Sequence, residues 1–488
     1  MLLLAGSAVS QDWKPMPFVR SADSVQPMTG IVLWADHERN STDAIALEFS
    51  YMSFAAVSPS EGVWNWKPVD SLLDAIASRK HQAILRFRYE YVGEPTTVPA
   101  WIRAKAGYQE TKGTSEGQET WFSDWRSIDL KKFTLDFHTA FAARYQDDPR
   151  LAFVQVGFGL WAEYHIYDGP MELGRTFPDK AFQAAFFAHL DTTYKRLPWS
   201  VSVDAASDWS PFEVDTTLKR KGFGLFDDSF MHQIHDAENR PNWLYFGDDR
   251  WKARPAGGEF SYYTDDDQKH VLDSVGIHGR TFESQAARYH ISYMIGSDQP
   301  SYHTMARIKQ ASMATGYRFK AVSWEVKADS LRLRLTNTGV APLYRDAYVM
   351  GEADGHRGTD TSKISLRTLM PGDTMEFKFR RGVSAAYYVY PGILCKHCVP
   401  GQSIQIEADL RGGAGVIAHA GRTGDVQWRM GAAGWFYSST KSATVAVRGL
   451  DGRLVWRGTL DATSGQWVRV PFGNTGFAHR FVTVDEGR

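Results

Sequence analysis

The chain has 488 residues with a formal net charge of −1, and 43% of the residues are hydrophobic. This length predicts two or three domains rather than one. The balanced charge argues against a nucleic-acid partner, because nucleic-acid-binding proteins usually carry a basic patch or stripe. No stretch approaches the ~20 apolar residues that a membrane-spanning helix needs, so no membrane span is expected.

Residues 1–10 read MLLLAGSAVS, a short apolar run followed by small residues. This order resembles the end of a secretory signal peptide, although the positively charged start of such a signal is missing. We therefore interpret residues 1–10 as a signal-peptide remnant and expect a bacterial protein that is secreted or held at the cell surface. An apolar N-terminal strand is the alternative.

Between residues 11 and 318, short β-rich apolar runs alternate with longer amphipathic segments, which predicts a parallel sheet with crossover helices. The expected strands are residues 30–36, 47–57, 82–91, 151–161, 199–206, 223–230, 253–260 and 291–298. The clearest helices are expected at residues 69–80, 130–145, 179–197 and 302–316. Eight strands over this length predict a (β/α)8 TIM barrel. An open doubly wound sheet is the alternative, but no Gly-rich dinucleotide fingerprint follows the first strand.

After residue 318 the pattern changes to alternation with a period of two and frequent turn signals, which predicts a β-sandwich over residues 319–410. The only two cysteines, Cys395 and Cys398, lie in LCKHCVPG. One pair does not complete a zinc site, so a local disulfide is expected. A Gly-rich linker then leads into a small β-rich C-terminal module within residues 411–488.

Active sites of (β/α)8 barrels collect at the carboxyl ends of the strands. The fourth expected strand runs into Glu163, and the seventh ends at Glu259. Two carboxyl groups across one barrel mouth suit hydrolysis of a glycosidic bond: one protonates the leaving oxygen, and the other attacks or activates water. We predict that Glu163 and Glu259 are this catalytic pair, with Asp228 in reserve. The structural alternative is a salt bridge from Glu163 to Arg86 or Arg88.

Other polar and aromatic residues at the strand ends are candidates for substrate binding. They are Trp34, Asp36, Arg86, Arg88, Glu90, Trp161, Tyr164, His165, Asp204, Trp209, Asp228, His232, Trp251 and Tyr262. Arg86, Arg88 and Glu90 alternate along one strand, so all three are expected to point inward. There the arginines would lower carboxylate pKa values, or they would fill the barrel as ion pairs.

Three motifs resemble clan A glycoside hydrolases: residues 63–91 (VWNWKPVDSLLDAIASRKHQAILRFRYEY), GLWAEYH at 159–165 and P-x-G-G-E at 255–259. They are also similar to secreted bacterial barrel proteins of unknown function that carry a following β-sandwich. The resemblance, over roughly residues 25–410, implies a retaining enzyme without a cofactor that acts on a β-linked polysaccharide or oligosaccharide. It implies Glu163 as acid/base and Glu259 as nucleophile. Ala162 stands where clan A usually has Asn.

Residues 444–460 (TVAVRGLDGRLVWRGTL) resemble the C-terminal sorting domains of exported Bacteroidetes-type proteins; an ordinary accessory β-domain is the alternative. Two other functions stay open. One is a non-catalytic carbohydrate-binding barrel, which Ala162 suggests. The other is a metal-dependent hydrolase built on His232, His235 and Asp236, although His-x-x-His is not the His-x-x-x-His spacing of zinc hydrolases, so no metal is expected.

Overall fold

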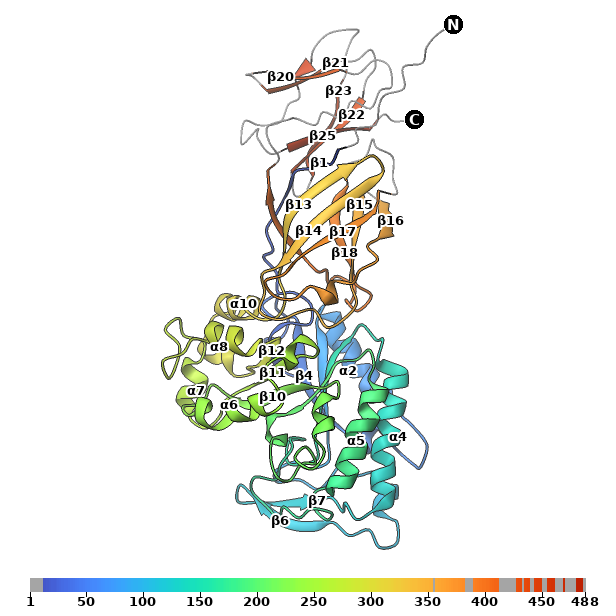
Figure 1. The fold of residues 1–488 in the computed structure, drawn as a ribbon, viewed down its shortest axis with the longest axis vertical. Coiled ribbons are helices and arrows are strands. Elements are labelled where there is room, and N and C mark those ends of the chain that lie inside the picture. Colours follow the sequence, from blue (N-terminus) through green and yellow to red (C-terminus); the bar gives the residue numbers. More distant parts are fainter. Residues whose placement is uncertain are drawn as a thin grey trace.

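The computed structural model describes residues 12–353, 356–381 and 389–411, and beyond them only strand segments between 427 and 485. The expected signal-peptide remnant at residues 1–10 lies outside the described residues. Figure 1 shows a barrel with its helices, a β-sandwich at one end of the barrel, and the C-terminal strands beyond the sandwich. In the described part of the chain, no helix is both long and apolar enough to cross a bilayer.

Residues 30–295 supply a closed barrel of eight parallel strands, so the predicted (β/α)8 barrel is confirmed. The strands are β3 (Gly30–Trp34), β4 (Leu47–Ser53), β5 (Gln82–Arg88), β8 (Leu151–Val156), β9 (Trp199–Ser202), β10 (Gly224–Phe230), β11 (Ala256–Phe260) and β12 (Tyr293–Ile295). Each lies in a predicted strand range. The open-sheet alternative fails because β12 pairs with β3 and closes the ring.

Helices cover the outside of the barrel. They are α1 (Phe54–Val57), α2 (Lys67–Ser78), α3 (Ala100–Arg103), α4 (Ile128–Tyr145), α5 (Lys180–Thr193), α6 (His235–Tyr245), α7 (Asp265–His270), α8 (Phe282–Tyr289), α9 (Gln299–Tyr302) and α10 (Met305–Met313). Short 3₁₀ turns are η1 (Val203–Ala205), η2 (Thr216–Arg220) and η3 (Arg250–Lys252), and a hairpin of β6 (Thr111–Ser115) and β7 (Gln118–Phe122) follows α3.

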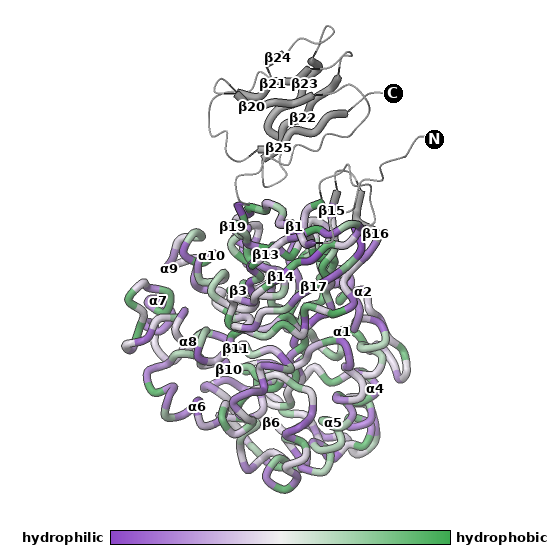
Figure 2. The backbone as a smooth tube through the Cα atoms, turned by 45° about the horizontal axis from the view of Figure 1, so that its top comes forward, coloured by the Kyte–Doolittle hydropathy of each residue, from purple (hydrophilic) through white to green (hydrophobic). Residues whose placement is uncertain are grey.

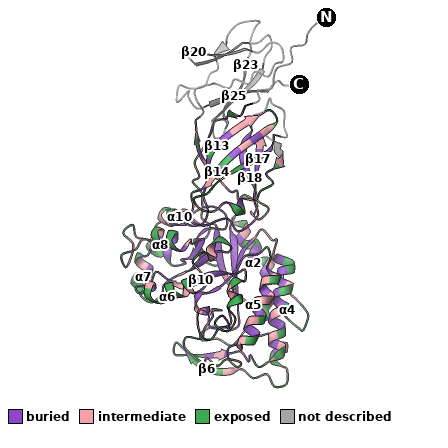
Figure 3. Cartoon of the chain, viewed as in Figure 1, coloured by how far each residue is buried: buried purple, intermediate pink, exposed green. Residues whose placement is uncertain are grey.

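The two longest helices begin where side chains cap them. Ser127 accepts a hydrogen bond from the backbone N–H of Leu130 at the start of α4, and Asp179 does the same for α5. Hydrophobic and hydrophilic residues alternate along both helices (Figure 2), and their apolar faces are buried against the barrel (Figure 3). This is the pattern that predicted both helices from the sequence.

The predicted sandwich has two sheets. One has the order β17-β14-β13-β19-β2, with β1 beside β13, and the other has the order β16-β15-β18. The strands are β13 (Phe319–Lys327), β14 (Ser330–Asn337), β15 (Tyr348–Ala353), β16 (His356–Thr361), β17 (Thr374–Arg380), β18 (Tyr390–Leu394) and β19 (Ile406–Leu410). A 3₁₀ turn, η4 (Leu366–Thr368), lies between β16 and β17.

Two strands of the sandwich come from the start of the chain. β1 (Lys14–Pro15) pairs with β13, and β2 (Phe18–Arg20) pairs with β19. Residues 11–318 were expected to form the barrel, so this boundary is corrected at its N-terminal side. The physical reason is burial: Met16 and Phe18 are buried in the same apolar cluster as the sandwich strands.

The sandwich closes the amino ends of the barrel strands. Arg345, which is 1% exposed, donates hydrogen bonds to the backbone oxygens of Gln146 (2.8 Å), Arg196 (2.6 Å) and Leu151 (3.0 Å), all at or before the starts of barrel strands. One apolar cluster contains barrel residues such as Phe153 together with sandwich residues such as Trp324. The carboxyl ends of the strands therefore open on the opposite side, where the β6–β7 hairpin lies (Figure 1).

The expected disulfide is absent, because Cys395 and Cys398 are both free thiols. Their side chains hydrogen-bond each other, and the Cys398 N–H donates to the Cys395 oxygen at 3.4 Å. Contacts to the barrel hold this turn in place without a covalent link: Gln82 donates to the His397 oxygen at 2.6 Å, and Lys396 lies 3.2 Å from Asp147.

Six short strands in the C-terminal range form two antiparallel three-stranded sheets, in agreement with the expected β-rich content of residues 411–488. They are β20 (Gln427–Gly431), β21 (Gly434–Ser438), β22 (Ala443–Gly449), β23 (Leu454–Leu460), β24 (Val468–Arg469) and β25 (Arg480–Asp485). Their resemblance to a sorting domain stays a prediction.

Candidate active site

The loop after β8 presents Glu163 at the barrel mouth. The backbone N–H groups of Phe158 and Gly159 both donate to the backbone carbonyl oxygen of Glu163, at 3.1 and 2.9 Å. Trp161 and Ala162 have φ values of 59° and 54°, in the left-handed region that non-glycine residues rarely adopt. A Cβ atom on Gly159 would lie 1.8 Å from the His165 oxygen. The chain therefore folds back on itself here at a cost in strain, as functional loops often do.

Ala162, the residue before Glu163, is packed inside this loop. Ala162 is 0% exposed, and its N–H donates to the Gly159 oxygen at 3.1 Å. A larger amide side chain has no room at a fully buried position in a strained turn. The Ala162 departure from the clan A pattern thus follows from the local backbone, and other groups have to supply any contact that Asn makes in clan A.

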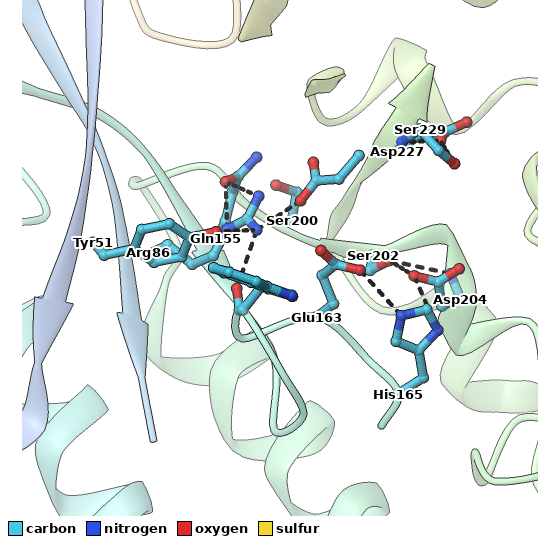
Figure 4. Close-up of polar contacts among 12 residues, drawn as sticks. Tyr51, Arg86, Gln155, Glu163, His165, Ser200, Ser202, Asp204, Asp227 and Ser229 are labelled. Atoms are coloured by element: carbon cyan, nitrogen blue, oxygen red, sulfur yellow. Dashed lines mark hydrogen bonds and ion pairs between the residues drawn. The ribbon is translucent and has the colours of Figure 1, made fainter. Parts of the chain in front are cut away.

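Arg86 lies at the centre of the site and ties its elements together (Figure 4). Its Nη1 atom lies 2.6 Å from Asp228 Oδ2 and donates to the Trp161 oxygen at 3.2 Å. Nε and Nη2 donate to Gln155 Oε1 at 2.8 and 2.7 Å. Arg86 is 0% exposed, and this buried ion pair is well supplied with hydrogen bonds, as such a pair must be to be tolerated.

The salt bridges proposed as an alternative for Glu163 are not the ones that form. Arg86 pairs with Asp228, and Arg88 pairs with Glu94 at 2.6 Å while stacking on the Tyr91 ring at 4.1 Å. Glu163 instead pairs with a histidine.

That histidine, His165, sits between two carboxylates. Its Nε2 atom lies 3.2 Å from Glu163 Oε2, and its Nδ1 atom lies 3.7 Å from Asp204 Oδ2. Burial opposes a charged imidazole, but the negative charges of Asp204 and Glu163 outweigh it and raise the pKa of His165 to about 9. Ser202 fixes Asp204 through a hydrogen bond of 2.5 Å to Oδ2. At neutral pH the site thus contains an imidazolium beside Glu163.

Two further carboxyl groups have the opposite surroundings. Burial, followed by the negative charge of Asp228, raises the pKa of Glu259 well above its usual range, although Arg86 opposes the shift. Burial also raises the pKa of Asp228, to about 7, against the effect of Arg86. Within the described residues, Asp228 Oδ1 is buried and has no hydrogen-bond partner. The surroundings of the two glutamates therefore differ: burial and a neighbouring carboxylate favour the protonated form of Glu259, while Glu163 faces the His165 ring.

The side chains that could bind a metal are Glu163, His165 and Asp204, whose ligand atoms lie within 4.8 Å of one another. Both ring nitrogens of His165 face carboxylates, so the group is arranged as an ion-pair chain around a protonated ring rather than around one ion. The metal alternative expected from His232, His235 and Asp236 is not supported by the geometry, because each of these residues has a separate partner. Those partners are Asn239 for His232 (3.3 Å), Asp227 for His235 (2.9 Å) and Arg288 for Asp236 (3.0 Å).

Four residues predicted to bind substrate are buried or lie at the other end of the barrel. Tyr164 is buried and donates to Gln183 at 2.6 Å within the helix layer. His232 is 2% exposed, and Trp251 stacks on His290, at the other end of β11. Glu90 is 0% exposed and accepts a hydrogen bond from the Ser123 N–H at 2.9 Å, and burial raises its pKa to about 8. β5 ends at Arg88, so the strand alternation does not extend to Glu90.

The remaining predicted residues lie nearer the strand ends. Trp34 packs on Tyr51 with ring centroids 5.7 Å apart, and Trp161 packs on Tyr91 at 4.2 Å. Tyr262 is 52% exposed, and the nearby charge of Glu259 contributes to its raised pKa. Asp36 and Trp209 are exposed at the surface.

Three residues of the site escaped the sequence-based prediction. Tyr51 lies 3.4 Å from Arg86 Nη1, and Gln155 links Arg86 to Tyr293 through a hydrogen bond of 2.8 Å to the phenol oxygen. Gln155 is a polar residue inside the apolar run LAFVQVG, and such an interruption was the available signal. Tyr51 and Tyr293 read as ordinary aromatic residues of strands.

Known proteins resemble this chain only distantly. Neither a family model nor a curated protein matches the chain. Among solved structures, it is similar to the catalytic domain of β-amylase from Paenibacillus polymyxa (9% identity, 60% of this chain and 99% of the other, TM-score 0.36). It is also similar to a glycoside hydrolase family 30 subfamily 8 xylanase, Xyn30A, from Clostridium acetobutylicum (11% identity, 76% of this chain and 100% of the other, TM-score 0.35). A third similar structure is a GH5-4 broad specificity endoglucanase from an uncultured bacterium (11% identity, 59% of this chain and 85% of the other, TM-score 0.36). At these identities and TM-scores the comparison carries nothing about the reaction.

Proposed function

We propose that this protein is a glycoside hydrolase that acts outside the cytoplasm on a β-linked polysaccharide or oligosaccharide. The observation that carries the proposal is a pair of glutamates at one barrel mouth with contrasting surroundings. Glu163 is paired with His165, and the half-buried Glu259 lies near enough to Asp228 for that charge to add to the effect of burial in raising its pKa. Two carboxyl groups held in different surroundings are the arrangement that acid and base roles require.

The different surroundings also favour a different catalytic role for each glutamate. Glu259, whose pKa is raised by burial and by the charge of Asp228, is suited to protonate the glycosidic oxygen as the C–O bond breaks. Glu163 faces a cation and is suited to attack the anomeric carbon, giving a covalent glycosyl–enzyme. Glu259, now ionised, then takes a proton from the water that releases the sugar. This assignment reverses the one implied by the clan A resemblance, in which Glu163 is the acid.

Aromatic side chains near the catalytic residues support a sugar as the substrate. Trp161 donates from Nε1 to Tyr167 at 3.2 Å, and the Tyr167 hydroxyl in turn donates to Glu116 at the tip of the β6–β7 hairpin. Tyr167 is 48% exposed and Tyr262 is 52% exposed. Exposed rings fixed by hydrogen bonds offer flat apolar surfaces on which a sugar ring packs.

The proposal is tested by isosteric substitution. We expect Glu163→Gln and Glu259→Gln each to lower kcat on a β-glucan or β-xylan by about 10²–10⁴-fold, the range that a positioned acid or base contributes. Glu94→Gln is the matched control, because Glu94 is a partly exposed glutamate that pairs with Arg88. Wild-type turnover in both variants contradicts the proposal, and glycan binding without any product favours the non-catalytic carbohydrate-binding alternative.

Leaving-group dependence separates the two role assignments. An aryl glycoside with a good leaving group, such as a dinitrophenyl β-glycoside, needs no protonation of the departing oxygen. We expect Glu259→Gln to keep most of its kcat/KM on this substrate, because kcat/KM reports the first step, and Glu163→Gln to lose it; the reverse result restores Glu163 as the acid. Proton NMR of the first-formed product tests retention of the anomeric configuration.

A further inference from the structure

A cavity of about 250 Å³ lies on the outside of the barrel, between α6, the end of α8 and the start of β11. Trp251 and His290 line it, and both contact the sandwich: the Tyr344 hydroxyl donates to the Trp251 oxygen at 2.6 Å, and His290 Nδ1 lies 2.6 Å from the Val340 oxygen. The cavity is therefore located beside the junction of the two domains and not at the barrel mouth.

The charge of the cavity lining is strongly positive. Arg240, Arg250, Arg254 and Arg288 line it together with a single carboxylate, that of Asp248. Two of these arginines are bound to other parts of the protein. Arg250 donates to the backbone oxygens of Lys219, Lys221, Phe223 and Phe246, and Arg288 pairs with Asp236 at 3.0 Å.

The other two arginines form no ion pair within the described residues, although the charge of Asp191 acts on Arg254 from a distance. Arg254 donates from Nε to the Gly222 oxygen (2.8 Å) and from Nη1 to the Ala253 oxygen (2.9 Å), whereas its Nη2 group donates to none of the described residues. Arg240 is exposed and forms no ion pair within the described ranges. A partly buried guanidinium without a directly paired carboxylate is unfavourable, and a bound anion lowers that cost.

The walls of the cavity are aromatic and held in place. The Trp251 ring stacks on His290 with centroids 3.5 Å apart and an interplanar angle of 14°. Trp243 is anchored by a hydrogen bond of 2.8 Å from Nε1 to Asp227, and Tyr289 packs on Trp243 at 5.4 Å. A ligand with a flat apolar face would meet fixed rings here, which lowers the entropic cost of binding.

We propose that this cavity binds a small organic anion with a single sugar-sized ring, carrying a carboxylate or a phosphate that Arg240 and Arg254 recognise. The volume is slightly below the range of about 300–1,000 Å³ that is typical of sites for drug-sized ligands, which favours one ring over a longer chain. This site does not depend on the function proposed for the barrel mouth.

Isothermal titration calorimetry at fixed ionic strength tests the proposal, with glucuronate, glucose 6-phosphate and neutral glucose as probes. We expect at least one anion to bind at least about tenfold more tightly than glucose, because two guanidinium groups contribute charge-assisted hydrogen bonds. The comparison of glucuronate with glucose 6-phosphate distinguishes a carboxylate site from a phosphate site. Arg240→Glu is expected to weaken the anion by at least about tenfold.

Two variants serve as controls. Arg334→Glu reverses the charge of an exposed arginine on β14 and is expected to leave binding unchanged. Glu259→Gln alters the barrel mouth and is also expected to leave anion binding unchanged. The proposal is overturned if neither anion binds more tightly than glucose, or if a folded Arg240→Glu protein and a folded Arg254→Gln protein both bind the anion as the Arg334→Glu protein does.

Discussion

Glu90 offers a quantitative check on the electrostatics described above. Its side chain is fully buried between the end of β7 and the loop that carries Glu163: it accepts a hydrogen bond from Ser123, and its backbone bridges to Leu160. Burial raises its pKa from an ordinary 4.5 to about 8. At neutral pH the folded protein therefore holds Glu90 protonated, whereas the unfolded chain ionises it.

The sign of the pH effect follows from proton counting. Between pH 4.5 and 8 the folded state binds one proton more than the unfolded state at Glu90, so the free energy of unfolding falls as the pH rises. The slope is about 1.4 kcal/mol per pH unit, or roughly 3 kcal/mol between pH 5 and pH 7. In Glu90→Gln the amide cannot ionise, so this contribution to the pH dependence disappears.

The assay is urea unfolding of both proteins at several pH values from 5 to 8, followed by tryptophan fluorescence. We expect the stability of Glu90→Gln relative to wild type to rise with that slope, whatever constant cost the substitution itself carries. Glu119→Gln on β7, whose side chain is 57% exposed, is the control and should follow wild type at every pH. Parallel curves for wild type and Glu90→Gln would refute a neutral, buried Glu90.

Three further outcomes follow from the geometry. Gly159→Ala should lower kcat by about 10²-fold with an unchanged circular dichroism spectrum, because the new Cβ displaces the catalytic loop; Gly62→Ala, where the Cβ meets nothing but φ is 73°, is the control for backbone strain outside this loop. Asp204→Asn should move the NMR titration of His165 from about 9 towards the ordinary value, and an unmoved titration contradicts the ion-pair chain. Arg345→Met should destabilise the protein by about 3 kcal/mol or more, measured by urea unfolding, because it leaves several buried carbonyl groups unpaired.

The barrel could be predicted from the sequence because its strands are short apolar runs with clear boundaries. β8, for example, is buried along its whole length, and its apolar run LAFVQV marks it as a strand between two layers. The strands β1 and β2 could not be predicted as part of the sandwich. Their partners β13 and β19 lie about 300 to 400 residues away, and no local pattern encodes such a pairing.

The candidate site was predicted in outline from one rule, that the strand ends face the mouth. This rule found Glu163, Glu259 and Asp228. It does not place Tyr164, because the direction of a side chain after a strand ends depends on the loop backbone and not on alternation, and it does not apply to Trp251, which precedes β11. The double left-handed turn before Glu163 is such a case, and only the glycines nearby hint at it.

Because the sandwich covers the amino ends of the barrel strands, the two domains cannot be separated by a single cut in the chain. A cut at residue 318 follows the change in secondary structure, yet it would strip the barrel of the cover over Phe153 and leave β13 and β19 without their N-terminal partners. The N-terminal strands β1 and β2 pair with β13 and β19 of the sandwich, so neither domain is continuous in the sequence. We therefore expect residues 12–410 to fold together, and a fragment of residues 30–318 to be less stable than the same residues in the whole protein.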